Sequence, residues 1–328
     1  MSSVFNHDND ASSSSLNTYM YNHSSIIIMA NYSSSTAKLL VFPFLVLGCF
    51  VYVTSFTNPQ LSNPKIKLLV QTIPDKEQKL TFPYLQTNSC RTSMFSRNMN
   101  HTEYESLKKV FDIFDRICSM NQIDYFLYGG SLLGSVRHHD IIPWDDDVDV
   151  MVPYRQARQL RQELQKLRPW YILKETISWK FYSNHASRIL SKSWKWPFLD
   201  IFFYDENETH IWDMQPNYIR DFVYYKTDIF PFKKRPFLGR LAPSPAAPVS
   251  VLGKNYDVNL CLPLSYNHRA EGSSLGVRGE CAVPCHLLQD IHPFVKRVSI
   301  ISGGCNETLN FRDKVLNVFI DNSVSECE

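Results

Sequence analysis

The sequence lacks an excess of charge of either sign. Its 328 residues include 34 lysines and arginines against 32 aspartates and glutamates, a formal net charge of +2. Proteins that bind nucleic acid carry a basic surface to meet the phosphate backbone. The balanced composition therefore does not indicate a nucleic-acid partner.

The first 38 residues lack an apolar pattern, and the next 18 residues lack charge. Residues 1–38 have almost no alternation of apolar positions and are rich in Ser and Asn, which predicts a disordered cytosolic tail. Residues 39–56, LLVFPFLVLGCFVYVTSF, contain no charge and approach the ~20 residues of a membrane-crossing helix. A cleaved signal peptide would start near residue 1, so an uncleaved transmembrane signal anchor is predicted. Residues 57–90 then form a stem.

The features that set the orientation of this span disagree. Lys38 precedes it alone while Lys65 and Lys67 follow it, and this balance taken alone keeps the C-terminal part in the cytosol. Seven of the eight cysteines follow residue 89, which fits an oxidising compartment. N-glycosylation triplets after the span also fit a luminal body, and they begin at Asn100, Asn207 and Asn306. We predict a single-pass type II protein with a luminal body.

Residues 91–328 mix helical and strand patterns without an internal repeat. This indicates one α+β domain (α/β mixed), of roughly 240 residues, large enough for a sizeable core. Helices are predicted over 102–121, 131–139 and 154–167, and the part after residue 230 is expected to be loop-rich. Strands are predicted over 124–129, 147–153, 170–176, 187–192 and 196–205.

The stretch YGGSLLGSVRHHDIIPWDDDVDVMVP, residues 128–153, lacks the fingerprints of the common nucleotide and calcium loops. No Lys-Ser or Lys-Thr follows Gly134, which excludes a P-loop, and the glycine spacing fits neither a dinucleotide fingerprint nor a nucleophile elbow. An EF-hand needs Gly at position 150 and Glu at 156, where the chain has Val150 and Gln156.

The same stretch contains four closely spaced aspartates. In a strand Asp147 and Asp149 share one face, and each would raise the pKa of the other unless a cation lay between them. Such oxygen ligands favour Mg²⁺ or Mn²⁺, which also bind substrate phosphates; a solvated acidic turn is the alternative. Asp200 interrupts an apolar strand, so it either joins the metal ligands or pairs with a basic residue such as Arg188. Asp146 should face away, and Asp146→Asn is expected to matter least.

These residues closely resemble the signature of the LicD and fukutin family. The matching motifs are Gly129-Gly130-Ser131, Leu133-Gly134, Arg137-His138 and IPWDDDVD at 142–149. FLDIFFY and RPFLGRLAPSPAAPVSVLGKNYD are also similar, although Asp257 stands where the family usually has Gly. The resemblance covers residues 104–257. It implies a nucleotidyltransferase-like mixed sheet flanked by helices, in an enzyme of the Golgi or ER membrane.

The resemblance also implies an activity. Members move a phosphorylated alcohol, such as phosphocholine or ribitol phosphate, from a CDP-linked donor onto a glycan hydroxyl of a glycoprotein or glycolipid. A catalytically silent member that binds glycan or a partner glycosyltransferase is the alternative, and the intact D-x-D pattern favours activity. The implied metal ligands are Asp145, Asp147, Asp149 and Asp200, of which the last three are catalytic.

Phosphate or nucleotide would contact Gly129, Gly130 and Ser131 through backbone N–H groups at a helix start. Arg137 is either a phosphate ligand or a partner of the acidic turn. Further basic residues have two interpretations, a role at the site (general base or phosphate path) or an incidental place on the surface: His138, His139, Lys233, Lys234 and Arg235. Late cysteines form either disulfides or a structural zinc site with nearby histidines: Cys261, Cys281, Cys285 and Cys305.

Overall fold

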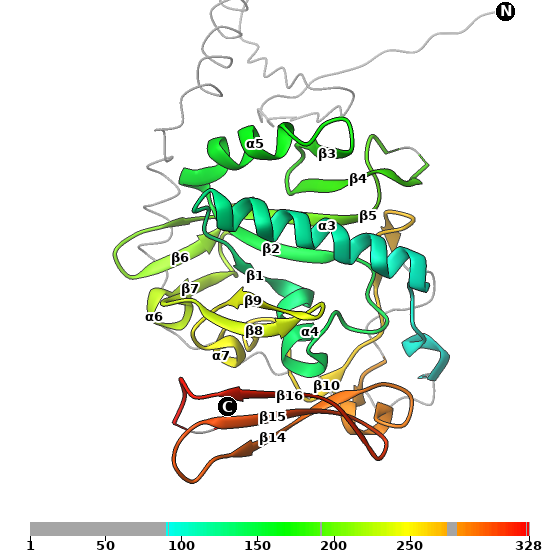
Figure 1. Ribbon diagram of the computed structural model, residues 1–328, viewed down its shortest axis with the longest axis vertical. Coiled ribbons are helices and arrows are strands. Elements are labelled where there is room, and N and C mark those ends of the chain that lie inside the picture. The colour runs from blue at the N-terminus through cyan, green and yellow to red at the C-terminus, as the bar shows by residue number, and fades with distance from the viewer. Residues whose placement is uncertain (1–89, 91, 191, 274–280, 326, 328) are drawn as a thin grey trace, which may run out of the picture. The chain divides into compact units, whose positions relative to one another are not determined.

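The structure is a computed structural model that describes residues 90, 92–190, 192–273, 281–325 and 327 (Figure 1). All of them belong to one compact unit, residues 59–328. The predicted tail, membrane span and stem lie outside the described residues, apart from Cys90. Within the described part of the chain, no helix is long and apolar enough to cross a membrane.

A mixed sheet forms the centre of the unit. Its strand order is β1 (Phe126–Leu127), β2 (Val148–Pro153), β5 (Lys195–Glu206), β4 (Trp179–Arg188) and β3 (Tyr171–Lys174). β2 and β5 run parallel, whereas the other pairs along this order are antiparallel. β6 (His210–Asp213) pairs with the end of β5, and β7 (Val223–Tyr225) pairs with β6. The mixed sheet with its helices confirms the predicted α+β class.

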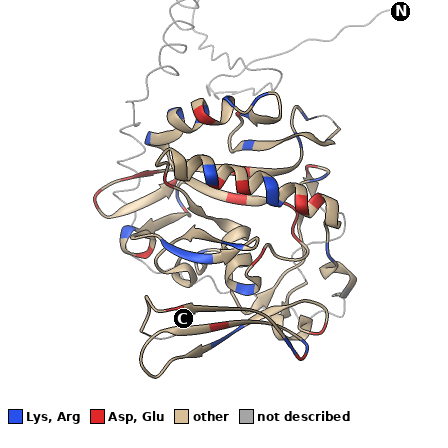
Figure 2. Ribbon diagram, in the orientation of Figure 1, with Lys and Arg blue, Asp and Glu red and all other residues tan. Residues whose placement is uncertain are grey.

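Two helices lie against the β3–β4–β5 part of the sheet. A capping box between Asn100 and Glu103 begins α3 (His101–Met120), whose buried stripe includes Phe111 and Phe114. Figure 2 shows acidic and basic residues on the rest of α3, as expected for a half-exposed helix. A 3₁₀ turn, η2 (Tyr154–Gln156), leads into α5 (Ala157–Gln165), so the second helix is shorter than its predicted 154–167.

A third helix, α4 (Gly129–His138), links the central sheet to the C-terminal part. It contacts β2, the strand β8 (Lys233–Phe237) and the strand β14 (Phe294–Ser299). Because neighbours surround it, even its polar residues Ser135 and Arg137 are buried. The sequence predicts this helix correctly but places its start two residues late.

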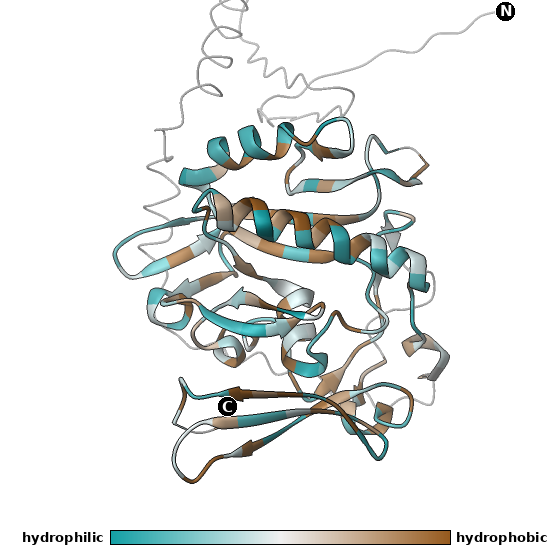
Figure 3. Cartoon of the chain, viewed as in Figure 1, coloured by the Kyte–Doolittle hydropathy of each residue, from teal (hydrophilic) through white to brown (hydrophobic). Residues whose placement is uncertain are grey.

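The C-terminal half contains more regular structure than the predicted loops. β8 pairs with β9 (Arg240–Ser244), and β14, β15 (Cys305–Phe311) and β16 (Lys314–Asp321) form a separate sheet. Figure 3 shows β16 as largely hydrophobic, and Val315 and Val318 are more than half exposed. The remaining short elements are η1 (Thr92–Phe95), α6 (Lys226–Ile229), α7 (Pro248–Leu252), β10 (Leu260–Cys261), β11 (Tyr266–Asn267), β12 (Gly272–Ser273), β13 (Val283–Pro284) and η3 (Cys285–Leu288).

Three disulfides fasten these C-terminal elements. They join Cys90 to Cys281, Cys261 to Cys285, and Cys305 to Cys327. The zinc alternative is therefore wrong, because each of the four sulfurs proposed as ligands is part of a disulfide. The first disulfide closes a loop of 191 residues, which restricts the unfolded chain strongly.

Candidate active site

Three neighbouring strands bring an acidic pair and a lysine into one row. Asp149 on β2 is the register partner of Asp200 on β5, and Asp200 is the partner of Lys180 on β4. Asp147 lies just before β2 begins. Oxygen atoms of Asp147, Asp149 and Asp200 all lie within 4.8 Å of one another. We call these three residues the acidic cluster.

The acidic cluster is buried, and burial changes its electrostatics. Asp147 and Asp200 are only 5% and 4% exposed. Burial, and after it the charges of Asp147 and Asp200, hold the pKa of Asp149 well above its usual range. Burial likewise raises the pKa of Asp145 to about 6. The Lys180 ammonium lies 2.8 and 3.0 Å from the two Asp200 oxygens and offsets part of this charge.

These properties fit a divalent metal ion. Three carboxylate oxygens converge, and they are ligands that Mg²⁺ and Mn²⁺ prefer. Burial and the neighbouring carboxylates raise the pKa of Asp147 and Asp149, and a bound cation would offset this cost of ionising them. Asp145 lies beside the acidic cluster rather than within the group of converging oxygens, although its charge contributes to the raised pKa of Asp147.

The first turn of α4 lies directly against the acidic residues. A Cβ at Gly130 would come 2.8 Å from Asp145 Oδ2, and one at Gly129 would come 3.1 Å from Asp149 Oδ2. Gly129 also has a φ of +50°, which favours glycine. The Ser131 hydroxyl accepts the Asp149 N–H at 2.7 Å. Glycine thus lets the positive end of the helix, where N–H groups lack intrahelical acceptors, approach the carboxylates.

Gly130→Ala tests this close approach. The added methyl would displace the Asp145 carboxylate, while alanine in a helix stabilises by about 0.5–1 kcal/mol relative to glycine. We expect weaker metal binding with little change in the free energy of unfolding, measured by calorimetric titration and urea unfolding. Gly134→Ala is the contrasting variant, because its Cβ would meet the Asp140 carbonyl at 2.5 Å and destabilise the fold. Unchanged metal affinity in Gly130→Ala would contradict the argument.

Sequence reasoning missed the residues that cover the acidic cluster. The hairpin β11–β12 brings His268 Nε2 to 3.3 Å from Asp147 Oδ2. Glu271 of the same hairpin lies 3.8 Å from Lys180 Nζ. Burial, and then the charges of Asp149 and Asp145, raise the pKa of Tyr256, so its phenol also lies near the cluster. Tyr256 lies in the stretch RPFLGRLAPSPAAPVSVLGKNYD that resembles the family, whereas His268 and Glu271 belong to no local motif that points to the acidic cluster.

Asp146 has a structural role that the sequence did not suggest. Its oxygens are not among those that converge with Asp149 and Asp200, and its carboxylate accepts the main-chain N–H groups of His268 and Arg269 at 3.4 and 3.2 Å. Its own carbonyl accepts the Trp196 indole N–H at 2.7 Å. Asp146 is completely buried, so Asp146→Asn would disturb the hairpin instead of being the mildest change.

The basic residues at the other end of α4 have structural partners. The Arg137 guanidinium donates to the carbonyls of Asp257 and Val258 at 2.7 and 2.8 Å, so its partners are main-chain carbonyls and not the acidic turn. Phosphate binding by Arg137 stays a prediction. Burial lowers the pKa of His138 to about 3, and its Nδ1 lies 2.7 Å from the Pro293 carbonyl. His139 contacts Glu307 at 3.0 Å. Both histidines are buried, not surface residues, and they lie at the C-terminal end of α4, whereas Gly129 and Gly130 lie at its start.

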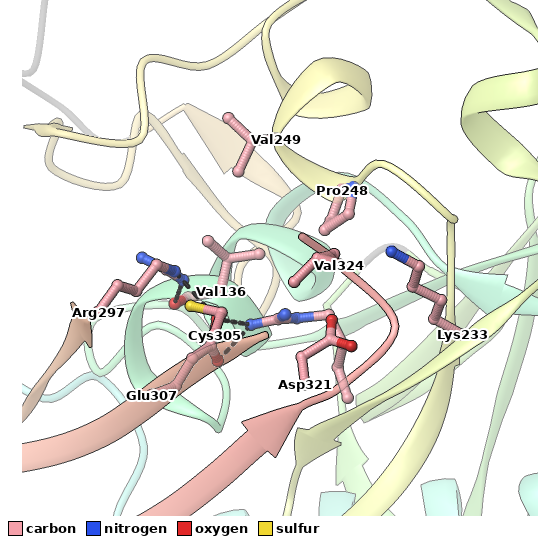
Figure 4. A pocket seen from close by; sticks show the side chains of 10 residues that line it. Val136, Lys233, Pro248, Val249, Arg297, Cys305, Glu307, Asp321 and Val324 are labelled. Atoms are coloured by element: carbon pink, nitrogen blue, oxygen red, sulfur yellow. Dashed lines mark hydrogen bonds and ion pairs between the residues drawn. The ribbon is translucent and has the colours of Figure 1, made fainter. Parts of the chain in front are cut away.

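The predicted basic loop is the strand β8. Arg235 is buried and donates to both Glu307 oxygens at 2.7 and 2.9 Å. A small cavity at this end of α4 is lined by Lys233, Arg235, Arg297 and Glu307 among others (Figure 4). Because none of the acidic cluster lines it, this cavity is separate from the candidate active site.

Comparisons with known proteins identify a domain. Residues 122–247 match the family described as LicD/FKTN/FKRP, nucleotidyltransferase domain. An uncharacterized protein of Rickettsia typhi is 28% identical over 155 residues, 47% of this chain and 45% of that protein. Lipopolysaccharide cholinephosphotransferase LicD of Haemophilus influenzae is 49% identical over 41 residues, 12% of this chain and 16% of that protein. Mouse ribitol 5-phosphate transferase FKRP is 68% identical over 28 residues, 8% of this chain and 6% of that protein.

The matched region contains the candidate site. The chain spans about half the length of the Rickettsia relatives that it matches, and far less of the two named transferases. Residues 122–247 include α4, β2, β4 and β5, and therefore the whole acidic cluster with Lys180. Residues 122–247 therefore form a domain that matches the LicD/FKTN/FKRP nucleotidyltransferase family.

Proposed function

We propose that the protein is a metal-dependent phosphotransferase. It moves a phosphorylated alcohol, of the phosphocholine or ribitol-phosphate type, from a CDP-linked donor onto a glycan hydroxyl. The observation that carries the proposal is the convergence of three carboxylates, of which those of Asp147 and Asp200 are buried, beside the N-terminus of α4. The relatives with named activities are a cholinephosphotransferase and a ribitol 5-phosphate transferase, which supports a substituted phosphate as the transferred group.

The residues of the site divide the chemistry among themselves. Asp147, Asp149 and Asp200 would hold Mg²⁺ or Mn²⁺ with Asp145 alongside, and the bound ion supplies positive charge that stabilises the pyrophosphate and the leaving CMP. The backbone of Gly129 and Gly130 offers N–H groups to phosphate oxygens. The glycan hydroxyl oxygen forms a bond to the alcohol-side phosphorus and gives up its proton to solvent, and the phosphorus–oxygen bond to CMP breaks. Lys180 keeps the Asp200 carboxylate oriented.

A hydrolysis screen tests the proposal directly. The purified protein is incubated with CDP-choline, CDP-ribitol, CDP-glycerol or CDP-ethanolamine, and released CMP is measured with Mg²⁺, with Mn²⁺ and with EDTA. We expect metal-dependent CMP release from at least one donor. No release from any donor would favour a catalytically silent member, although such a protein has no need to keep buried like charges together.

We also propose that the body is luminal, anchored in the ER or Golgi membrane by residues 39–56. Six cysteines in three disulfides support an oxidising compartment, because cytosolic thiols are kept reduced. The Asn207 triplet supports it too, because it occupies the turn between β5 and β6, where Glu208 and Thr209 are exposed. Asn100 lies exposed at the start of α3, and Asn306 lies on β15.

Glycosylation at Asn207 is the expected consequence of this orientation. The protein expressed in animal cells should shift in mobility after endoglycosidase treatment, and Asn207→Gln should remove part of that shift. Asn217→Gln is the matched control, because Asn217 is exposed on a nearby loop but begins no acceptor triplet. A protein without glycan at Asn100, Asn207 and Asn306 would favour the cytosolic orientation instead.

A further inference from the structure

The hairpin β11–β12 is fixed over the acidic cluster by contacts on two other elements. The main-chain N–H groups of His268 and Arg269 donate to Asp146 in the loop before β2. The Arg269 guanidinium donates to Glu103 at the start of α3, at 2.7 Å. These bonds hold the tip of the hairpin, and therefore His268, at a defined place beside the site.

Packing also orients the His268 ring. The ring lies edge-on to Phe198, with centroids 5.7 Å apart, and against Tyr266, with centroids 5.0 Å apart. Its Nε2 is then 3.3 Å from Asp147 Oδ2. The His268 side chain is 22% exposed, so the imidazole forms part of the wall between the buried carboxylates and solvent.

Asp147 connects the histidine to the acidic cluster. Its carboxylate converges with those of Asp149 and Asp200, and it also forms a second group with Asp146 and His268 whose ligand atoms lie within 4.8 Å of one another. Both Asp146 oxygens already accept main-chain N–H groups, whereas His268 presents Nε2 to Asp147. His268 Nε2 therefore lies beside an oxygen of one of the carboxylates that converge in the acidic cluster.

We propose that His268 supplies an imidazole nitrogen to the divalent ion of the acidic cluster. The inference rests on the proposed metal-dependent function and extends it to the identity of the metal. A site made only of carboxylates suits Mg²⁺, whereas imidazole is a ligand for transition-metal ions and Mg²⁺ rarely takes it. The hairpin thus makes this site favour Mn²⁺ over Mg²⁺.

Pulsed electron paramagnetic resonance of bound Mn²⁺ tests the inference without an activity assay. The purified full-length protein is stripped with EDTA and loaded with one equivalent of Mn²⁺ in the absence of nucleotide. We expect the ¹⁴N coupling of one directly bound histidine in the wild type. The coupling should vanish in His268→Gln, because a glutamine amide binds metal through oxygen. Titration calorimetry should show Mn²⁺ affinity falling at least about tenfold, with a smaller change for Mg²⁺.

Two controls distinguish a failure of the His268 inference from a failure of the proposed metal-dependent function. His185→Gln removes an exposed histidine of β4 and should leave the coupling unchanged. Wild-type protein that binds Mn²⁺, loses binding in Asp149→Asn, and yet shows no nitrogen coupling would overturn the role of His268 while leaving the proposed function intact. Wild-type protein that binds neither Mn²⁺ nor Mg²⁺ would overturn both. If His268→Gln does not fold, as judged by metal-free thermal unfolding, the wild-type spectrum alone decides.

Discussion

Asp149→Asn is expected to lower the rate of phosphotransfer by about 10³-fold or more without destabilising the metal-free protein. The change removes a charge from the acidic cluster but keeps the size and shape of the side chain. A divalent ion contributes several kcal/mol of charge stabilisation in the transition state, and each 1.36 kcal/mol corresponds to a tenfold change in rate. Losing one of three converging carboxylates should therefore abolish most of the activity.

Metal should decide whether Asp149→Asn or the wild type is the more stable protein. Burial and the neighbouring charges raise the pKa of Asp149 in the folded state. Between its ordinary pKa and this raised value, the folded wild type binds more protons than the unfolded chain, so its stability falls as pH rises. At pH 7 in EDTA, Asp149→Asn should be at least as stable as the wild type. Added Mg²⁺ or Mn²⁺ should reverse the order, because only the wild type gains binding energy.

CMP release in the donor screen and thermal unfolding with and without metal are the two measurements. Asp205→Asn is the matched control, since Asp205 lies on the same strand β5 but outside the acidic cluster. We expect its rate to stay within about twofold of the wild type. If Asp149→Asn had the wild-type rate of phosphotransfer, the metal mechanism would be wrong, whatever the stability of the variant.

The alternation of side chains along a strand is enough to predict that Asp147 and Asp149 share a face. Alternation within 147–153 indicates which side chains share a face, and the structure has β2 at Val148–Pro153. The apolar run around Asp200 likewise predicts β5. The pairing of strands cannot be predicted in this way, because periodicity within one strand carries no information about its neighbour in the sheet. The parallel register that sets Asp149 opposite Asp200 had to come from the structure.

Lys180 illustrates what the local pattern misses. Strands were predicted at 170–176 and 187–192, yet β4 occupies Trp179–Arg188 between them. A lysine inside the buried run Trp179–Tyr182 makes that segment look unsuitable for a central strand. Its burial makes sense only with Asp200 as cross-strand partner, at a sequence separation of 20 residues. His268, more than 120 residues from the acids that it meets, is harder still to predict.

The partners of Arg137 and His138 are also distant in the sequence, so the local pattern does not predict them. Arg137 and His138 fall near the end of a glycine-rich stretch, where a phosphate or catalytic role is a natural hypothesis. In the structure Arg137 and His138 contact the carbonyls of Asp257 and Pro293, which belong to segments more than 100 residues later. The C-terminal sheet that surrounds α4 was expected to be loops, so nothing in the sequence suggested buried partners.

Glu307→Gln is expected to cost about 3–5 kcal/mol of unfolding free energy, the largest stability effect we predict. Glu307 is 2% exposed and receives charged hydrogen bonds from Arg235 at 2.7 and 2.9 Å and from Arg297 at 2.9 Å. Figure 4 shows Glu307 beside Arg297 at the end of α4. Glutamine keeps the shape but leaves Arg235, itself buried, without a counter-charge, and this uncompensated charge is the source of the cost.

The pH dependence distinguishes this electrostatic loss from a packing defect. Burial alone would raise the pKa of Glu307, but the His139 hydrogen bond and the two arginines outweigh it and lower that pKa to about 2. The stability that the ionised carboxylate contributes is therefore complete above the ordinary value of 4.5 and is lost as pH falls toward 2. Urea unfolding at pH 7, 5 and 3 should give a wild-type advantage that shrinks at pH 3.

Glu163→Gln provides the matched control. Glu163 on α5 pairs with Lys166, the residue after that helix, at 2.6 Å. The lysine side chain is 67% exposed, and surface pairs of this kind contribute less than about 1 kcal/mol. The acceptor triplet at Asn306 survives in Glu307→Gln, so a change in glycosylation does not confuse the comparison. If the cost of Glu307→Gln were the same at pH 3 as at pH 7, its cause would be packing, and Arg235 would not need its counter-charge.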